Sequence, residues 1–236
     1  NSNEGTAMIT QTATRTASKA HPAVVMAAQT AGDAASLSSY IDQFGTPMSF
    51  CANTEIYGED EPAEYLYKVV GGAVRTCRIL ADGRRQIGSF YLPGEVFGLE
   101  SGDNHSFSAE AIANSRVMVV KRSALLALAG RDRAIANELW TTTCRELRNA
   151  QNHILLLIKT AKERVVAFLL EMADRAPVGG QIELPMSRQD IADYLGLTIE
   201  TVSRTLTELA RTAAIELPAT RCVVLRNRAA LAKLHG

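Results

Sequence analysis

Four residues near the C-terminal end of the chain have side chains that can recognise the edges of DNA bases. Ile199, Glu200, Ser203 and Arg204 recur at helical spacing, which places them on one face of a predicted helix. An arginine can donate two hydrogen bonds to guanine O6 and N7, and a glutamate can accept one from cytosine N4. Ser203 can bond or touch a neighbouring base, and Ile199 can contact a thymine methyl group.

An alternative interpretation is that Glu200 and Arg204 form a solvated surface ion pair, because residues four apart on a helix are neighbours. The flanking residues favour DNA recognition, since they predict two short helices joined by a tight turn. Ser187 with Asp190 resembles a capping box, Gly196 suits the left-handed end of a helix, and Thr198 caps the second helix. The predicted buried faces are Ile191, Ala192 and Leu195 in the first helix, and Val202, Leu206 and Leu209 in the second.

Such a pair of helices is the pattern of a helix-turn-helix, whose second helix enters the major groove by its N-terminal residues. Hydrogen-bond donors near the two helix starts suit DNA phosphates. These candidate phosphate contacts are Ser187, Arg188, Gln189, Thr198 and Thr201. Residues 214–217 and 222–225 predict two strands of a wing, with Arg221 near its tip as a further phosphate candidate.

Residues 131–160 predict a long helix with an apolar stripe at alternating steps of four and three. The stripe comprises Trp140, Cys144, Leu147, Gln151, Ile154, Ile158, Ala161 and Val165. Such a pattern over about four heptads is typical of a dimer interface, in which the polar Gln151 sets the register. The alternative is a helix that lies on the core of its own domain.

Short apolar segments separated by turn signals predict an all-β barrel or roll between residues 46 and 122. The predicted strands cover residues 65–70, 74–80, 86–91 and 117–121. Asp82 and Gly83 predict a hairpin turn, because such a turn needs a positive φ. Residues 1–38 are rich in Ala, Thr and Ser, which favours a mobile arm with a short helix near residues 23–28.

Composition excludes several classes of protein. The 236 residues carry 25 Lys and Arg against 25 Asp and Glu, so any DNA-binding charge is local to one face. No run of about 18 apolar residues exists, which argues against a membrane span. The sparse cysteines lack C-x-x-C spacing and favour a reducing, cytoplasmic location. No hydrolase, zinc-protease or phosphate-loop motif is present and the histidines are scattered, so we do not expect an enzyme.

The order of β-roll, long helix and winged helix resembles the Crp/Fnr superfamily of bacterial transcription regulators. The resemblance covers nearly all of the chain after the arm. It rests on the E-x-x-S-R run of the Fnr/FixK branch at residues 200–204 and on residues 65–72, 92–98 and 186–198. It implies a homodimeric activator of microaerobic, respiratory and nitrogen-fixation genes that recognises a TTGA-N6-TCAA-like palindrome through Glu200, Ser203 and Arg204.

An activator of this kind must contact RNA polymerase. By analogy with activating loops of the family, the candidate contact is the hairpin tip formed by Asp82, Arg84 and Arg85, which we expect to be exposed. The alternative is an ordinary charged turn. A protein-binding module without DNA contacts is a further alternative, under which Arg204 has no role in activity.

Two departures from the family concern its sensors. Fnr holds an iron–sulfur cluster through cysteines, but this chain has none before Cys51, and Met118 stands where the cysteine of the roll is expected. Crp-like members bind cyclic AMP through an Arg-Ser pair, but no Arg or Lys lies between Arg85 and Arg116 to neutralise a phosphate. His105 is a weak substitute that we expect on the surface.

We therefore expect no cofactor and a constitutively competent DNA-binding protein, with a ligand-gated regulator of the same fold as the alternative. The expected fold is α+β: a β-roll like a cyclic-nucleotide-binding jelly roll, a long dimerisation helix and a C-terminal winged helix-turn-helix. The expected divisions are a partly disordered N-terminal arm at 1–45, the roll at 46–130, the dimerisation helix at 131–160 and the winged domain at 161–236.

Overall fold

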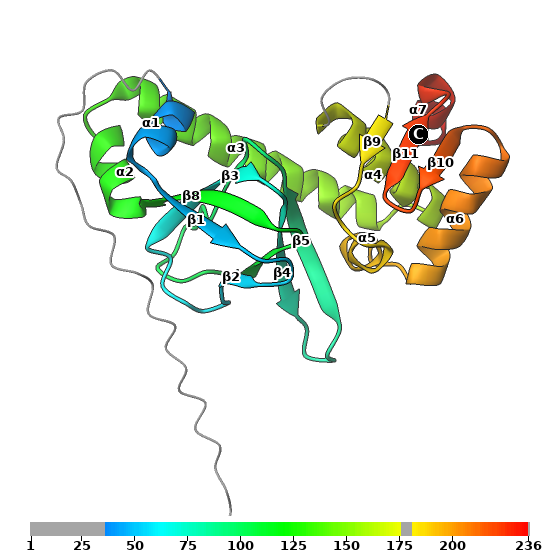
Figure 1. Cartoon of the computed structure of the whole chain (residues 1–236), viewed down its shortest axis with the longest axis horizontal. Helices are drawn as coiled ribbons and strands as arrows, with labels where there is room; N and C mark the ends of the chain where they lie inside the picture. Colours follow the sequence, from blue (N-terminus) through cyan, green and yellow to red (C-terminus); the bar gives the residue numbers. More distant parts are fainter. Residues whose placement is uncertain (1–35, 176–180, 236) are drawn as a thin grey trace, which may run out of the picture. The chain divides into compact units, whose positions relative to one another are not determined.

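Two four-stranded antiparallel sheets form the roll of this computed structural model, which describes residues 36–175 and 181–235 (Figure 1). The sheets have the orders β1-β8-β3-β6 and β2-β7-β4-β5. The strands are β1 Thr46–Phe50, β2 Glu55–Tyr57, β3 Tyr65–Gly71, β4 Val74–Ile79, β5 Arg85–Tyr91, β6 Val96–Phe97, β7 Ser108–Ala111 and β8 Ser115–Lys121. The predicted β-roll and its four predicted strands are confirmed.

Aromatic and aliphatic side chains form the core of the roll. The rings of Tyr57, Tyr67 and Phe97 lie with centroids 5.0–6.2 Å apart and pack with buried valines of β3 and β8. The β4–β5 hairpin turns at Gly83, whose φ is +84°, as the Asp82-Gly83 signal predicts. This hairpin also forms much of the contact with the C-terminal helices.

Helix α1 (Leu37–Phe44) lies at the end of the predicted N-terminal arm. Its Leu37 and Ile41 are buried against the roll and α3, and Lys68 of the roll donates to the Asp42 carboxylate at 2.6 Å. Residues 36–45 are therefore folded, while the short helix predicted near residues 23–28 lies outside the described residues.

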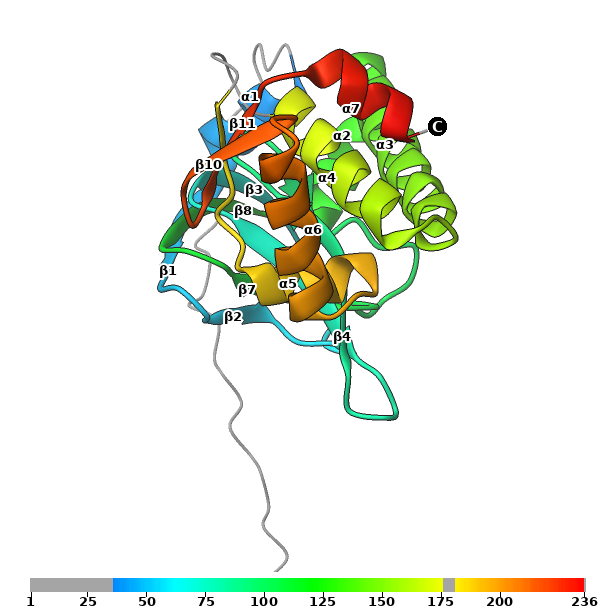
Figure 2. The same cartoon turned by 90° about the vertical axis from the view of Figure 1, so that its right-hand side faces the viewer.

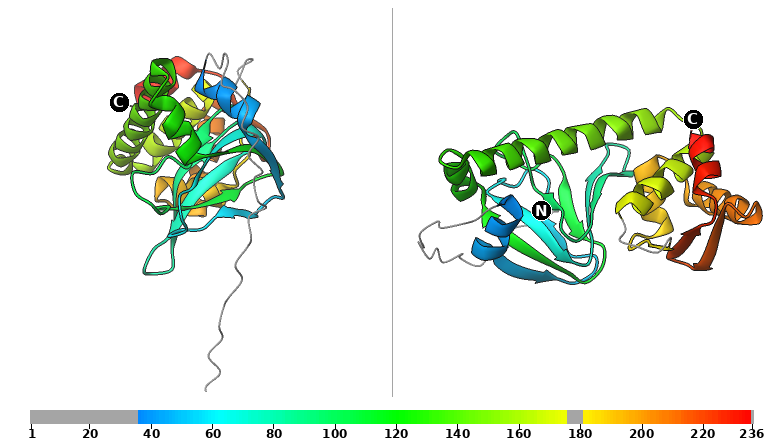
Figure 3. Two further views of the ribbon diagram at one scale, coloured as in Figure 1. Left: turned by 90° about the vertical axis from the view of Figure 1, so that its left-hand side faces the viewer. Right: turned by 90° about the horizontal axis from the view of Figure 1, so that it is seen from above.

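A single helix, α3 (Arg133–Leu157), follows α2 (Arg122–Ala129) and runs past the roll towards the C-terminal helices (Figure 3). Its stripe was predicted to continue through Val165, and this is wrong. Helix α3 ends at Leu157, and α4 (Ala161–Arg175) begins separately because Thr160 and Glu163 cap it reciprocally. Val165 is buried in the core of the C-terminal part.

The C-terminal part contains the predicted helix-turn-helix and wing. Its further elements are β9 Gln181–Glu183, α5 Arg188–Leu195, α6 Ile199–Arg211, β10 Ile215–Ala219, β11 Cys222–Leu225 and α7 Arg228–His235. Strand β9 adds to the two predicted wing strands and gives the order β10-β11-β9. One apolar core joins Phe168 of α4 and Leu195 of α5 to Ile87 and Phe90 of the roll. Within residues 36–175 and 181–235, the structure contains no helix that could span a membrane.

Gly196 offers a direct test of the turn between α5 and α6. Its φ is +61°, and an added Cβ would come no closer than 3.5 Å to Leu157, so a substitution is strained by the backbone rather than by crowding. We expect Gly196→Ala to lower the free energy of unfolding by about 1–2 kcal/mol and Gly196→Asn to cost less, since Asn tolerates this conformation. Urea unfolding measures both; equal stability of Gly196→Ala and the parent would contradict the left-handed assignment.

Candidate nucleic-acid interface

Both helices of the helix-turn-helix begin with the predicted caps. The Ser187 hydroxyl accepts from the Asp190 backbone N–H at 3.1 Å, and the Asp190 carboxylate accepts from the Ser187 N–H at 2.9 Å. The Thr198 hydroxyl accepts from the Thr201 N–H at 3.2 Å. These bonds satisfy backbone donors that a helix start leaves without partners, so the capping residues set where α5 and α6 begin.

Helix α6 has one buried face and one exposed face. Val202, Leu206 and Leu209 are buried, as predicted. Glu200, Ser203 and Arg204 are exposed on the N-terminal half of the helix, and so is Ile199 beside them. Figure 2 shows α6 on the outside of the C-terminal part. The predicted base-contacting residues therefore share one accessible surface.

The start of α6 favours the ionised form of the Glu200 carboxyl. Its pKa is lowered by its own backbone N–H at the helix start, by the Thr198 hydroxyl and by the charge of Arg204. No ion pair joins Glu200 to Arg204 in the part of the chain that the structure describes. The Glu200 carboxylate and the Arg204 guanidinium therefore do not pair with each other. This disfavours the interpretation of these two residues as a surface ion pair.

Several predicted phosphate-binding side chains have partners within the chain. The Ser187 hydroxyl donates to the Asp190 carboxylate, and the Gln189 amide donates to the Asp193 carboxylate at 2.6 Å. The Arg188 guanidinium donates to the Thr220 carbonyl at 3.2 Å, and its burial lowers its pKa. Arg188 therefore supports the turn of the wing.

The remaining phosphate candidates lie at two places, where Thr198 and Arg221 are exposed and Thr201 is partly exposed. Thr198 and Thr201 share a 3.1 Å contact between their hydroxyls at the start of α6. Arg221 is exposed in the turn between β10 and β11. Its carbonyl accepts from the Leu184 N–H at 2.7 Å, which ties the wing turn to the segment that precedes α5.

The apolar stripe of α3 is exposed on the single chain. Exposure runs from 59% at Leu147 through 66% at Ile154 and 71% at Trp140 to 80% at Ile158. Cys144 is partly exposed and Gln151 is exposed. The alternative that this stripe lies on the core of its own domain is therefore wrong, and a long apolar face is left without a partner.

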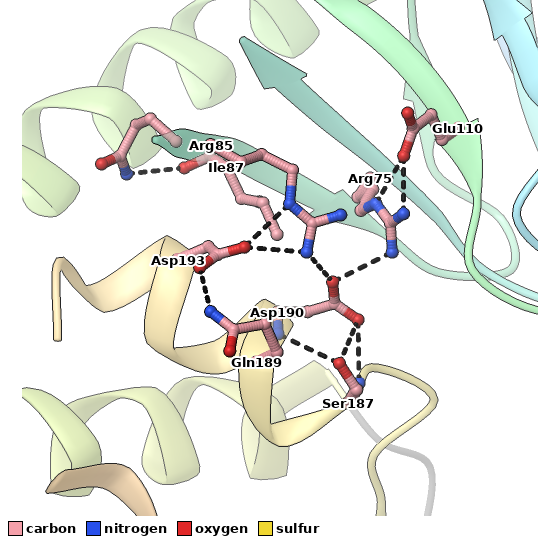
Figure 4. Close-up of polar contacts among 9 residues, drawn as sticks. Arg75, Arg85, Ile87, Glu110, Ser187, Gln189, Asp190 and Asp193 are labelled. Atoms are coloured by element: carbon pink, nitrogen blue, oxygen red, sulfur yellow. Dashed lines mark hydrogen bonds and ion pairs between the residues drawn. The ribbon is translucent and has the colours of Figure 1, made fainter. Parts of the chain in front are cut away.

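The β4–β5 hairpin tip differs from the prediction at one residue. Asp82 and Arg84 are exposed and form an ion pair at 2.7 Å. Arg85 was expected to be exposed with them, but its side chain is only 25% exposed and lies against α5, where it pairs with Asp190 and Asp193 (Figure 4). Sequence reasoning missed this role because Arg85 and these aspartates are more than 100 residues apart.

His105 was expected on the surface, and this is wrong. The residue is 2% exposed because its ring stacks on Tyr57 at 3.6 Å, and burial lowers its pKa. Its Nδ1 lies 3.6 Å from the Glu100 carboxylate. The Glu100 carboxylate also accepts hydrogen bonds from the Ser106 N–H and hydroxyl, at 3.1 and 2.9 Å. These two donors could otherwise bind the phosphate of a ligand, but here they already bind Glu100.

Two family models match this architecture. A Crp-like helix-turn-helix domain matches residues 163–234, and a cyclic nucleotide-binding domain matches residues 47–132. Together with the exposed face of α6, these matches define a transcription regulator of the Crp class with a DNA-binding helix-turn-helix.

Relatives of known function and a solved structure show to which branch of this class the chain belongs. The chain is 50% identical over 212 residues to the nitrogen fixation regulation protein FixK of Azorhizobium caulinodans, covering 87% of this chain and 86% of the relative. It is 44% identical to FixK of Rhizobium meliloti, covering 76% and 82%. The structure of FixK2 from Bradyrhizobium japonicum matches with a TM-score of 0.79 and 55% identity, covering 81% and 98%. The chain belongs to the Crp/Fnr family of transcription regulators, in its FixK-type branch.

The contacts of Ser106 predict that cyclic AMP does not bind. No Lys or Arg lies between Arg85 and Arg116, and the Ser106 donors already serve Glu100. A ligand that binds only the folded state raises the midpoint of thermal unfolding. We therefore expect cyclic AMP to leave the midpoint unchanged, with a cyclic-AMP-binding protein treated identically as the control. A saturable rise in the midpoint would contradict this account of the roll.

Proposed function

We propose that the chain is a homodimeric transcription activator of microaerobic and nitrogen-fixation genes that recognises a TTGA-N6-TCAA-like palindrome. The observation that carries the proposal is the exposed N-terminal face of α6, with Glu200, Ser203 and Arg204 above a buried apolar face. The names of the FixK relatives support the gene class. A cytoplasmic location fits an activator of bacterial promoters.

In the proposed complex, α6 lies in the major groove. Arg204 donates to guanine O6 and N7, while the ionised Glu200 accepts from the cytosine N4 amine. Ser203 and Ile199 contact neighbouring bases. Thr198, Thr201 and Arg221 hold the phosphate backbone, which fixes orientation without reading sequence. Because the net charge of the chain is zero, this local surface supplies the attraction to DNA.

The proposed dimer forms through the α3 stripe. Its large apolar residues are exposed on one chain, and burying them against a second copy removes that surface from water. A two-fold pair places two recognition helices about one DNA turn apart, roughly 34 Å, so a two-fold protein matches a palindrome. The polar Gln151 then sets the register of the two helices.

We propose that the activator works without cyclic AMP or an iron–sulfur cluster. The aromatic and aliphatic core of the roll and the Glu100–Ser106 bonds favour this over the ligand-gated alternative. Contact with RNA polymerase stays a proposal for the exposed Asp82 and Arg84 at the hairpin tip. Arg85 is not part of this proposed contact surface, because its side chain pairs with Asp190 and Asp193 of α5.

Arg204→Ala tests the proposed base contact. Loss of a bidentate arginine–guanine contact should cost about 1–3 kcal/mol on the palindrome and relax discrimination at that guanine. Fluorescence anisotropy measures binding to the palindrome, to a duplex with both guanines replaced and to a scrambled duplex. Arg211→Ala is the matched control, because this exposed arginine lies in the last turn of α6. Equal losses of Arg204→Ala on all three duplexes would make Arg204 a phosphate contact and contradict the proposal.

Ile158→Glu tests the proposed dimer interface. Two like charges placed in the stripe should weaken dimerisation and palindrome binding together, because each buried carboxylate loses its hydration. Sedimentation velocity measures the oligomeric state. Leu126→Glu, at an exposed leucine of α2 outside the stripe, should stay dimeric. A dimeric Ile158→Glu protein would show that the stripe is not the interface.

A further inference from the structure

Two arginines of the roll converge on one carboxylate at the start of α5 (Figure 4). Asp190 Oδ1 accepts from Arg75 Nη1 at 3.0 Å and from Arg85 Nη2 at 2.7 Å. The other oxygen, Oδ2, accepts from the backbone and hydroxyl of Ser187. The same side chain therefore caps the first helix of the helix-turn-helix and bonds it to the β4–β5 hairpin.

Arg75 and Asp190 are the buried members of this cluster, in which two arginines pair with three carboxylates. Arg85 also donates to Asp193 at 2.8 Å, one turn further along α5. Arg75 is held from its other side by Glu110, at 2.6 and 2.8 Å. The Asp190 side chain is 4% exposed, so water does not substitute for a missing partner. The hairpin thus contacts α5 at two positions on one face.

The C-terminal end of α5 is held as well. The Tyr194 carbonyl lies 2.7 Å from His153 Nε2 of α3 and accepts from the Gln86 amide of β5 at 3.4 Å. The Tyr194 ring stacks on His153 at 4.1 Å and packs against Phe90 at 5.2 Å. Helix α5 is therefore attached at both ends to the roll and to the helix that carries the proposed dimer stripe.

These attachments leave the recognition surface free. Glu200, Ser203 and Arg204 are exposed while the Arg75 and Arg85 contacts are in place. The contacts therefore orient the helix-turn-helix without covering the face that meets DNA.

We propose that Arg75 and Arg85 are positioning residues that fix the orientation of the helix-turn-helix on the roll, and thereby the half-site spacing that the dimer accepts. The inference rests on the proposed function, because spacing has meaning only for a dimer on a palindrome. The chain between α3 and α4 is only residues 158–160. Without the Arg75 and Arg85 contacts to α5, the C-terminal part could rotate about residues 158–160. The two recognition helices of a dimer could then reach half-sites at other spacings.

The experiment compares palindromes whose spacer is five, six or seven base pairs long, using full-length protein and fluorescence anisotropy. One base pair turns a half-site by about a tenth of a DNA turn, so a rigid dimer should prefer the six-base-pair spacer by at least about tenfold. Arg85→Met keeps the length of the side chain but loses both carboxylate partners, and this preference should fall at least about threefold. Arg78→Met, which breaks the exposed pair with Glu59 inside the roll, should keep the parent preference.

The readout separates positioning from a structural role. A variant that is only less stable loses active protein equally for all three duplexes, so an unchanged spacing preference in Arg85→Met would overturn the inference. Should Arg85→Met not fold in a thermal unfolding control, Arg85→Lys and Asp193→Asn carry the same test. The amide oxygen introduced by Asp193→Asn would still accept from Gln189, but the charge opposite Arg85 would be lost, so relaxed spacing is again the expected result.

Failure of the proposed function gives a different result. In that case the parent protein binds the six-base-pair palindrome no better than a scrambled duplex, and both proposals fall together. A parent protein that prefers the palindrome, with Arg85 and Asp193 variants that keep its spacing preference, overturns only the positioning role.

Discussion

The Asp190 carboxylate is the interaction on which the arrangement of this chain depends. One oxygen completes the cap of α5, and the other receives hydrogen bonds from two arginines of the roll. Removing either arginine would leave a buried charge with fewer partners, which is costly in a protein interior. Local helix formation and the docking of the helix-turn-helix on the roll are therefore carried by the same side chain.

Apolar packing and hydrogen bonding act together at this junction. Phe90 of the roll packs against Phe168 of α4 and Tyr194 of α5, within a core that is continuous with the helix-turn-helix. Apolar burial stabilises the contact between the roll and the helix-turn-helix but is not directional. The arginine–carboxylate hydrogen bonds are directional, so they set the orientation of α5 on the roll. Helix α3 also takes part in this junction, because His153 contacts α5. Its apolar stripe is exposed on the single chain, where we propose that a second copy binds.

Local signals made the helix-turn-helix predictable from sequence. The caps at Ser187 and Thr198 and the left-handed Gly196 act over three or four residues, and all three were found as expected. The sequence predicts that the stripe continues through Val165 because the apolar period runs on into α4 and hides the Thr160–Glu163 cap. The roles of Arg85 and His105 were missed because they depend on partners brought close by the fold, not by the chain.

The contacts inside the roll bear on whether the roll holds an effector. In the roll, Ser106 donates to the Glu100 carboxylate, His105 stacks on Tyr57, and aromatic rings pack with aliphatic side chains in the interior. The same roll contacts α5 through Arg75 and Arg85. The recognition face is exposed on the single chain, which fits the proposal that the protein binds DNA without an effector.

The most direct test of the proposed function is the DNA preference of the purified protein in air, with no ligand added. Fluorescence anisotropy would compare a TTGA-N6-TCAA duplex with a scrambled duplex at two salt concentrations. We expect a preference of at least about 10³-fold for the palindrome. Weak, equal and strongly salt-dependent binding to both duplexes, which is the behaviour of a purely electrostatic contact, would contradict the proposal.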